Sequence, residues 1–227
     1  GRQPLLVTLA AVPILAIDSR SRIQVLSFLL SAAIIPTTLF ITWGGLVPPK
    51  LQFVGEGFSI THLILAYCYA GVITLILSPR FFSYRLRTTL IIAVLSILIN
   101  GIFNWIEFVP MRTLSNQLIP ESMFPIYVKI CSGLLVSLGT LYLASLLKNL
   151  INNRENLNYI FLGVATIFIC FTALKVTHQF SSRYVAQALP LFTLITEPYS
   201  EASYFKATRI VLGSLLGVAI LTSYYFG

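Results

Sequence analysis

The chain has 227 residues, of which 57% are hydrophobic and only 10% are charged, and its formal net charge is +8. A soluble domain carries about 25% charged residues because its surface must face water, so this composition excludes a water-soluble globule. A basic excess suggests nucleic acid in a soluble protein, but basic cytoplasmic loops produce the same excess in a membrane protein. We therefore expect the lipid bilayer, and no nucleic acid, as a partner.

The apolar residues form long blocks, which is the pattern of lipid-facing segments. A segment in lipid must pair its backbone groups within a helix or a closed barrel, and residues 88–101 lack the alternation of barrel strands. The sequence predicts an all-α fold, a polytopic transmembrane helical bundle of about seven or eight spanning or re-entrant helices. In chain order the blocks cover residues 4–17, 23–43, 58–77, 88–108, 127–147, 159–174, 185–195 and 210–226.

Two blocks contain prolines that interrupt a helical pattern. Pro36 is expected to kink the second block. Block 185–195 contains Pro190 and is too short to span comfortably, so it is expected to be a re-entrant or tilted element, or the end of the sixth helix after a break. The chain starts at Gly1, close to its first apolar stretch. We therefore expect one transmembrane domain, residues 1–227, that forms the C-terminal part of a longer protein.

The charges of the loops orient the predicted bundle. The loops after the second and fourth blocks hold few basic residues, whereas those after the first, third and fifth blocks hold more, namely Arg20, Arg22, Arg80, Arg85, Arg87, Lys148 and Arg154. By the positive-inside rule the basic set faces the cytoplasm. Segments 44–57 and 109–125, which are longer and rich in Gly, Pro and polar residues, then face the opposite side. Long loops on one face favour function there.

Two polar residues in the blocks are candidates for substrate binding. Glu107 lies at the outer end of the fourth block, where a carboxylate near membrane depth is costly and therefore a functional candidate; it could also simply reach the headgroup region. His62 lies about one turn inside the third block. It could donate a hydrogen bond to an anionic substrate group, or it could pack as a polar residue between helices.

Basic residues form the most suggestive pattern. Lys50 in one outer loop, and Lys175 and Arg183 in another outer segment, could converge on one anionic ligand. The planar guanidinium of an Arg at a membrane boundary matches phosphate oxygens, and Tyr184 follows Arg183 directly. The alternative is that Arg183 reaches the interface beside a tyrosine anchor without binding a ligand.

Several kinds of chemistry have no signature in the sequence. Cys68, Cys131 and Cys170 lie far apart inside apolar blocks, and no His, Cys or carboxylate cluster has metal-ligand spacing. There is no Gly-rich phosphate loop and no Gly-x-Ser-x-Gly elbow. We expect no metal, no cofactor and no catalytic group among these residues.

Two segments, WGGLVPPKLQF and SSRYVAQALPLF, resemble segments of the C-terminal half of class C membrane glycosyltransferases. Those multi-helix enzymes use sugars linked to polyprenyl or dolichyl phosphate. The order of elements is similar over most of the chain: a helix, a Gly-Pro outer loop, several helices, an Arg-Tyr segment and a terminal helix.

The resemblance implies that the chain binds a lipid-linked sugar on the extracytoplasmic or lumenal side and supports its transfer to an acceptor. Arg183 would lie near the lipid phosphate, with Tyr184 beside it. The acidic catalytic residue of the family lies in the first outer loop of the full enzyme, whereas the one aspartate here, Asp18, is predicted to be cytoplasmic. We expect that carboxylate, and thus a partner for this chain, in the missing N-terminal part. The alternative is a transporter or a non-catalytic membrane subunit.

Overall fold

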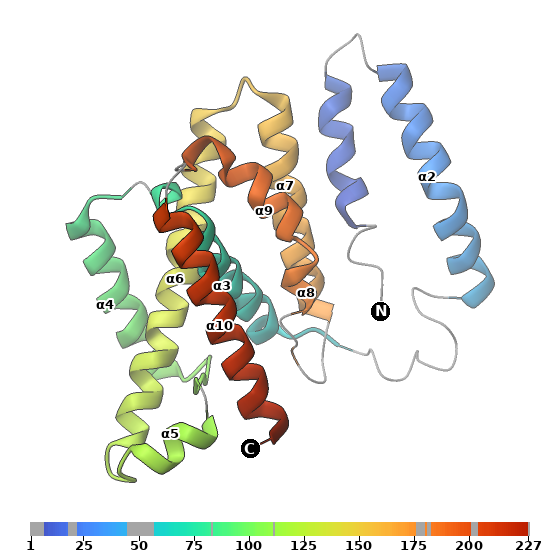
Figure 1. Ribbon diagram of the computed structural model, residues 1–227. Helices are drawn as coiled ribbons and strands as arrows, with labels where there is room; N and C mark the ends of the chain where they lie inside the picture. The colour runs from blue at the N-terminus through green and yellow to red at the C-terminus, as the bar shows by residue number, and fades with distance from the viewer. Residues whose placement is uncertain are drawn as a thin grey trace. The chain divides into compact units, whose positions relative to one another are not determined.

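The computed structural model describes residues 7–17, 22–44, 57–82, 84–110, 112–175, 180, 183–200 and 204–226, and no strand occurs among them (Figure 1). The prediction of an all-α fold is confirmed. In chain order the helices are η1 (Thr8–Ile17), α2 (Arg22–Trp43), α3 (Ile60–Leu77), η3 (Pro79–Phe81), α4 (Leu86–Phe103), α5 (Arg112–Leu118), α6 (Phe124–Asn152), α7 (Leu157–Phe171), η4 (Thr172–Lys175), α8 (Arg183–Ala186), α9 (Leu189–Thr196), η5 (Glu197–Tyr199) and α10 (Tyr204–Phe226).

Within this described part, five helices are long and apolar enough to cross a membrane. They are α2, α3, α4, α6 and the helical run Leu157–Lys175 that joins α7 to η4. A spanning helix needs about 20 residues because the hydrocarbon layer is roughly 30 Å thick. These helices are those of a membrane protein, as the composition predicts.

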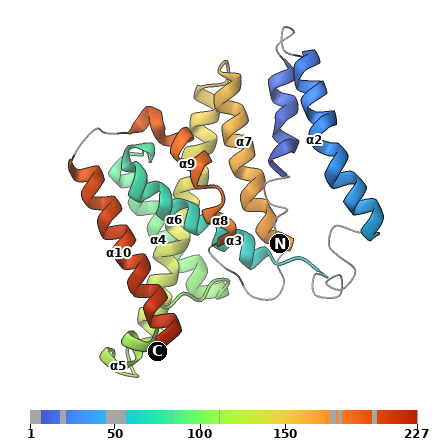
Figure 2. The ribbon, with the colours of Figure 1, turned by 45° about the vertical axis from the view of Figure 1, so that its right-hand side comes forward.

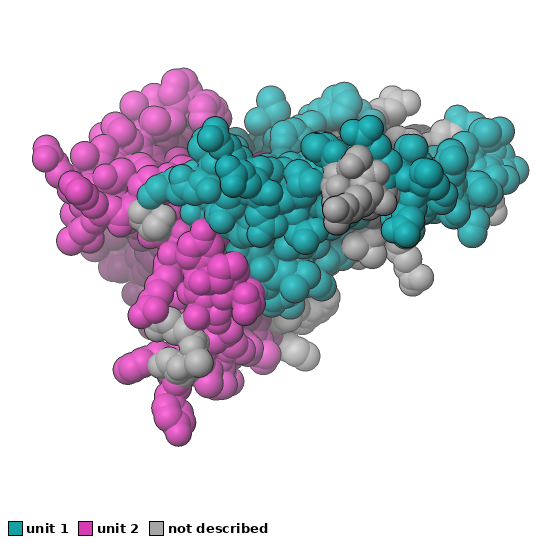
Figure 3. Space-filling model, turned by 90° about the horizontal axis from the view of Figure 1, so that it is seen from above, with its two compact units in different colours: residues 1–66, 146–195 teal, residues 67–145, 196–227 magenta. Residues whose placement is uncertain are grey.

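The chain divides into two compact units (Figure 3). Unit 1 contains residues 1–66 and 146–195, and unit 2 contains residues 67–145 and 196–227. Helices α3 and α6 each continue from one unit into the other. The expectation of a single membrane domain stays a prediction.

In unit 1, η1 packs against both α2 and α7 (Figures 1 and 2). Its residues Ala11 and Val12 are buried, and α7 contributes a buried face of mostly small and apolar residues. Helix α2 continues through Pro36 and has no buried residue at all. An apolar helix of this kind needs a hydrophobic surrounding, which lipid provides.

The core of unit 2 is the contact between α3 and α6. A methyl group placed on Gly71 would lie 2.5 Å from the backbone oxygen of Leu138, and one on Gly139 would lie 3.0 Å from the Cα atom of Cys68. Each glycine therefore lies directly against the backbone of the other helix. Lipid supplies no hydrophobic force between helices, so close packing of small residues takes over that role.

Helix α6 uses small residues against α4 as well. A methyl group on Gly133 would lie 2.6 Å from the Cα atom of Ile97, and the Ser137 hydroxyl lies 3.3 Å from the backbone oxygen of Ala93. Small residues of α6 thus face both of its neighbours: Gly133 and Ser137 face α4, and Gly139 faces α3. Helix α6 is consequently the central helix of unit 2.

The fourth block ends earlier than predicted. It was expected to reach residue 108, but α4 ends at Phe103, and Asn104 follows in the left-handed conformation with φ of 50°. The buried Asn100 side chain donates to the backbone oxygen of Ile106 (2.9 Å) and accepts from its N–H (3.0 Å). These two bonds replace the next helical turn and bend the chain away from the helix axis.

Three other segments also differ from the predicted blocks. Segment 109–125 contains the short helix α5, which the sequence pattern did not indicate. Block 185–195 is two short helices, α8 and α9, separated by a turn at residues 187–188 next to Pro190. The last helix begins at Tyr204, six residues earlier than predicted.

Replacing Gly71 by alanine should destabilise the protein, because the new methyl group meets backbone atoms that cannot rotate away. Overpacking of this kind costs about 1–3 kcal/mol. The matched control is Gly101→Ala, where the methyl group meets no atom within 4 Å and the better helix propensity adds up to ~1 kcal/mol. Thermal unfolding in detergent measures both, and equal midpoints for the two variants would contradict the proposed α3–α6 contact.

Candidate functional site

In unit 1 the beginning of α3 is joined to the end of the α7–η4 run. The backbone N–H of Ser59 donates to the backbone oxygen of Leu174 at 2.8 Å. The Ser59 hydroxyl accepts from the N–H of His62 at 3.3 Å, which caps the first turn of α3. Ser59 therefore fixes where His62 lies relative to the segment that follows η4.

His62 is half-buried, and its ring contacts Phe180. The two ring centroids are 5.7 Å apart and the planes are tilted by 44°. Consecutive residues in an extended chain advance at most about 3.6 Å, so the backbone of Arg183 lies no more than ~11 Å from that of Phe180. The contact thus places the Arg-Tyr segment close to the beginning of α3.

Lys175 lies at the same end of unit 1. It is exposed, and its Nζ atom is 4.9 Å from the centre of the Phe58 ring. A cation over an aromatic face is attracted by the ring quadrupole, by about 0.5–1 kcal/mol at exposed sites. The ammonium group is held at the surface beside the first turn of α3, where the backbone N–H groups carry partial positive charge.

Arg183 and Tyr184 are the first two residues of α8, a single helical turn that packs against α7. In both ribbon views α8 lies beside the C-terminal end of α7 (Figures 1 and 2). Val185 and Ala188 are fully buried and anchor this turn. Lys50, the third member of the predicted basic group, lies outside the described residues, so its convergence with Arg183 stays a prediction.

The structure therefore places His62, which the sequence pattern named separately, close to Lys175 and the start of α8. It adds Phe58, Ser59 and Phe180, which sequence reasoning missed. A signal for Ser59 exists in the sequence, because a Ser three residues before His62 at the edge of an apolar block is a typical helix N-cap. No sequence signal links Phe58 to Lys175.

Glu107 belongs to unit 2 and is exposed in the segment between α4 and α5. Both of its neighbours are fixed: Ile106 by the two bonds to Asn100, and Phe108 by an N–H that donates to the Ser132 hydroxyl of α6 at 2.8 Å. The carboxylate thus stands on a short segment tied to two helices. Neither Asn100 nor Ser132 was recognised from the sequence, although a polar residue such as Asn100 inside an apolar block is itself a signal.

Each end of α3 is bonded to a later part of the chain within its own unit. In unit 1, Ser59 is bonded to Leu174 before the first turn of α3. In unit 2, the hydroxyl of Ser78, the residue after α3, donates to the backbone oxygen of Tyr199 at 2.7 Å. Phe81 contacts the Tyr199 ring in the same place, with centroids 5.5 Å apart.

No group of three or more His, Cys, Asp or Glu residues that could hold a metal ion occurs in the described ranges. The chain matches no known family model, no curated protein and no solved structure. The site is therefore interpreted from its own geometry.

Replacing Asn100 by alanine should release the Glu107 segment, because the N–H and C=O of Ile106 lose their partners. Leaving buried polar groups unpaired costs about 1–3 kcal/mol each. We expect faster hydrogen exchange at residues 104–108, measured by mass spectrometry, with α6 unaffected. Asn116→Ala, at an exposed position of α5, is the control, and unchanged exchange at 104–108 in Asn100→Ala would show that these bonds do not hold the segment.

Proposed function

We propose that the chain is a multi-pass membrane protein whose unit 1 binds the phosphate of a polyprenyl-phosphate-linked sugar and supports transfer of that sugar. In this proposal it is the C-terminal membrane part of a class C glycosyltransferase in the cell inner or plasma membrane or the endoplasmic reticulum. The observation that carries the proposal is the Ser59–Leu174 bond, because it joins His62 to the basic segment of Lys175 and Arg183.

The orientation follows from the charges at the two ends of α3. Arg80, Arg85 and Arg87 follow its C-terminal end, which the positive-inside rule assigns to the cytoplasm. At 1.5 Å per residue, 18 residues span about 27 Å, close to the hydrocarbon thickness. His62 and Lys175 then lie at the outer boundary, where the phosphate of a lipid carrier also lies.

In this proposed topology the broken segment α8–α9–η5 is a further crossing. Helix α10, with 23 residues, adds another. Irregular backbone at membrane depth is tolerated where it is buried in protein, and Val185, Ala188, Phe192 and Ile195 of the broken segment are fully buried. Lys175 and Glu197 are both exposed, and such a crossing would place them on opposite sides of the membrane.

In the proposed chemistry, the residues of this chain stabilise the charge of the phosphate and do not act as a nucleophile. Arg183 donates two parallel hydrogen bonds to the phosphate, Lys175 adds a second positive charge, and the N-terminus of α3 favours an anion. As the glycosidic bond breaks, negative charge grows on the departing phosphate, and fixed cations stabilise that charge. The acceptor hydroxyl is activated by a carboxylate supplied outside this segment.

A transporter is the second candidate, and the break at residues 187–188 favours it. Transporters place discontinuous helices at membrane depth, where the free ends of the half-helices bind the substrate. The two candidates differ in the role of Arg183. A glycosyltransferase needs this arginine for transfer from a lipid carrier, whereas a transporter needs the turn between α8 and α9, whose helix ends would bind the substrate.

Arg183→Ala in the full-length enzyme should reduce sugar transfer from a polyprenyl-phosphate donor about 100-fold or more, because one donor to the developing charge is lost. Arg183→Lys should retain part of the activity, since it keeps the charge without the planar pair of donors. Arg112→Ala, an exposed arginine of α5, serves as the control. Wild-type transfer by Arg183→Ala, with normal membrane insertion, would remove Arg183 from the mechanism.

The crossing of residues 183–199 can be tested by labelling with a membrane-impermeant maleimide. Cys68, Cys131 and Cys170 are first replaced by alanine, and single cysteines are placed at Lys175, Glu197 and Arg154, all of which are exposed. We expect Lys175→Cys to react from outside only, and Glu197→Cys and Arg154→Cys only after the membrane is opened. Reaction of Lys175→Cys and Glu197→Cys from the same side would show a re-entrant segment instead.

A further inference from the structure

A second basic surface lies in unit 2, at the opposite end of α3. Five basic residues occur in the segments 78–90 and 196–212, against two acidic residues. The Nε atom of Arg209 lies 3.4 Å from the backbone oxygen of Ile76 in the last turn of α3, and a methyl group on Gly213 would lie 2.8 Å from the Ile76 side chain. These contacts hold the N-terminal half of α10 against the last turn of α3.

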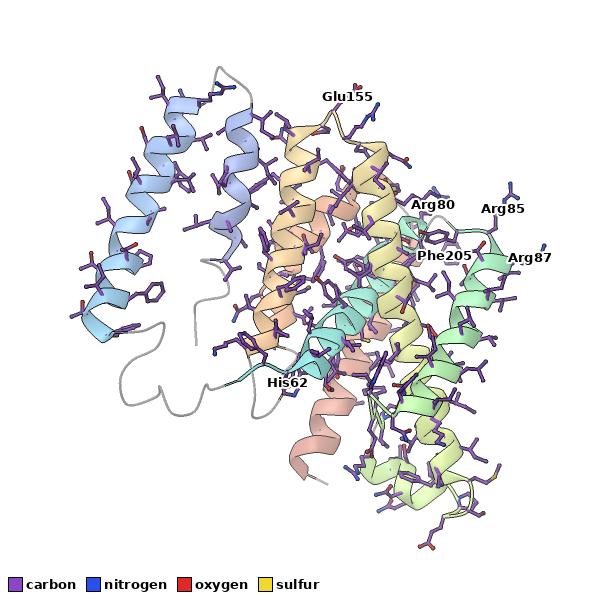
Figure 4. The ribbon with its side chains drawn as sticks, turned by 180° about the vertical axis from the view of Figure 1, so that it is seen from behind. His62, Arg80, Arg85, Arg87, Glu155 and Phe205 are labelled. Atoms are coloured by element: carbon purple, nitrogen blue, oxygen red, sulfur yellow. The ribbon has the colours of Figure 1, made fainter. Side chains whose placement is uncertain are left out.

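We call Arg80, Arg85, Arg87 and Lys206 the basic rim. Figure 4 shows Arg80, Arg85 and Arg87 at one end of unit 2, together with Phe205. Arg85 and Arg87 are exposed, and the stretch from residue 57 to residue 106 contains no acidic residue. The charges of these two arginines are therefore not balanced by their own segment.

The position of Arg85 and Arg87 is unfavourable for the helix that they begin. Arg85 is the N-cap of α4 and makes no side-chain cap bond. The N-terminus of a helix carries partial positive charge, so cations there destabilise the helix and anions stabilise it. A helix selected for stability alone would begin with Ser, Thr, Asp or Asn. An external anion would offset this local cost.

Aromatic residues flank the basic rim. Tyr204 and Phe205, in the first turn of α10, are 94% and 73% exposed, and the neighbouring Lys206 donates to the Ser200 hydroxyl at 2.6 Å. Tyrosine and other aromatic rings in this setting lie at the level of the lipid headgroups. The surface therefore combines cations with rings that enter an interface, which fits a lipid leaflet better than a soluble partner.

We propose that the basic rim binds anionic phospholipid headgroups of the cytoplasmic leaflet. Each basic side chain near an anionic membrane surface strengthens binding by roughly fivefold. The proposal is independent of the sugar-transfer proposal, because it concerns the other end of α3 and a lipid that is not a substrate. Arg154 provides a matched comparison: it is also exposed and predicted to be cytoplasmic, but Glu155 follows it directly.

The test is a titration of the purified full chain in neutral detergent with dioctanoyl-phosphatidylglycerol, followed by calorimetry. We expect saturable binding that weakens at high salt, and dioctanoyl-phosphatidylcholine should not compete. The double variant Arg85→Gln/Arg87→Gln should weaken binding by roughly tenfold or more, whereas Arg154→Gln should leave it unchanged. All of these side chains are exposed, so the variants should fold.

Three results would overturn the proposal. If phosphatidylcholine bound as tightly as phosphatidylglycerol, the surface would not distinguish anionic from zwitterionic headgroups. Equal binding of soluble glycerol 3-phosphate would show a site for free phosphate rather than for lipid. An equal loss in Arg154→Gln, or no loss in the double variant, would show that the basic rim is not the binding surface.

Discussion

The backbones of α3 and α6 meet where Gly71 lies against Leu138 and Gly139 lies against Cys68. In water such a contact would be one of many, but between helices in lipid the hydrophobic effect is absent and packing must hold the pair. Glycine gives up helix propensity of about 1 kcal/mol per position to permit this approach. The candidate residues His62 and Glu107 lie on or beside elements held by these two helices.

Helix α3 connects two surfaces that differ in their chemistry. Its first turn carries Ser59 and His62 and is bonded to the segment before Arg183. Its last turn receives Arg209 and is followed by Ser78, which is bonded to Tyr199. The same helix therefore contributes one end to each unit, and each end is held by bonds within its own unit.

The sequence predicted those parts of the fold that depend on local composition. The apolar blocks became helices because lipid leaves the backbone no other open structure. The predicted helix ends were wrong where the hydrogen bonds of a single polar side chain determine where the helix stops. Asn100 ends α4 by bonding to Ile106, and no hydropathy count contains that information. In the same way, His62 and Arg183 could be chosen from the sequence, but their proximity depends on the Ser59–Leu174 bond between residues more than a hundred positions apart.

The net charge of the chain is +8, and the basic residues near the two ends of α3 have different surroundings. At the proposed outer end, the described cation Lys175 lies over the ring of Phe58, which would favour recognition of a specific phosphate in the proposed function. At the proposed cytoplasmic end Arg85 and Arg87 are exposed and lack an acidic partner in their own segment, because many equivalent headgroups are available there. If both proposals hold, attraction between these arginines and anionic lipid would favour the orientation that places the proposed phosphate site on the opposite side of the membrane.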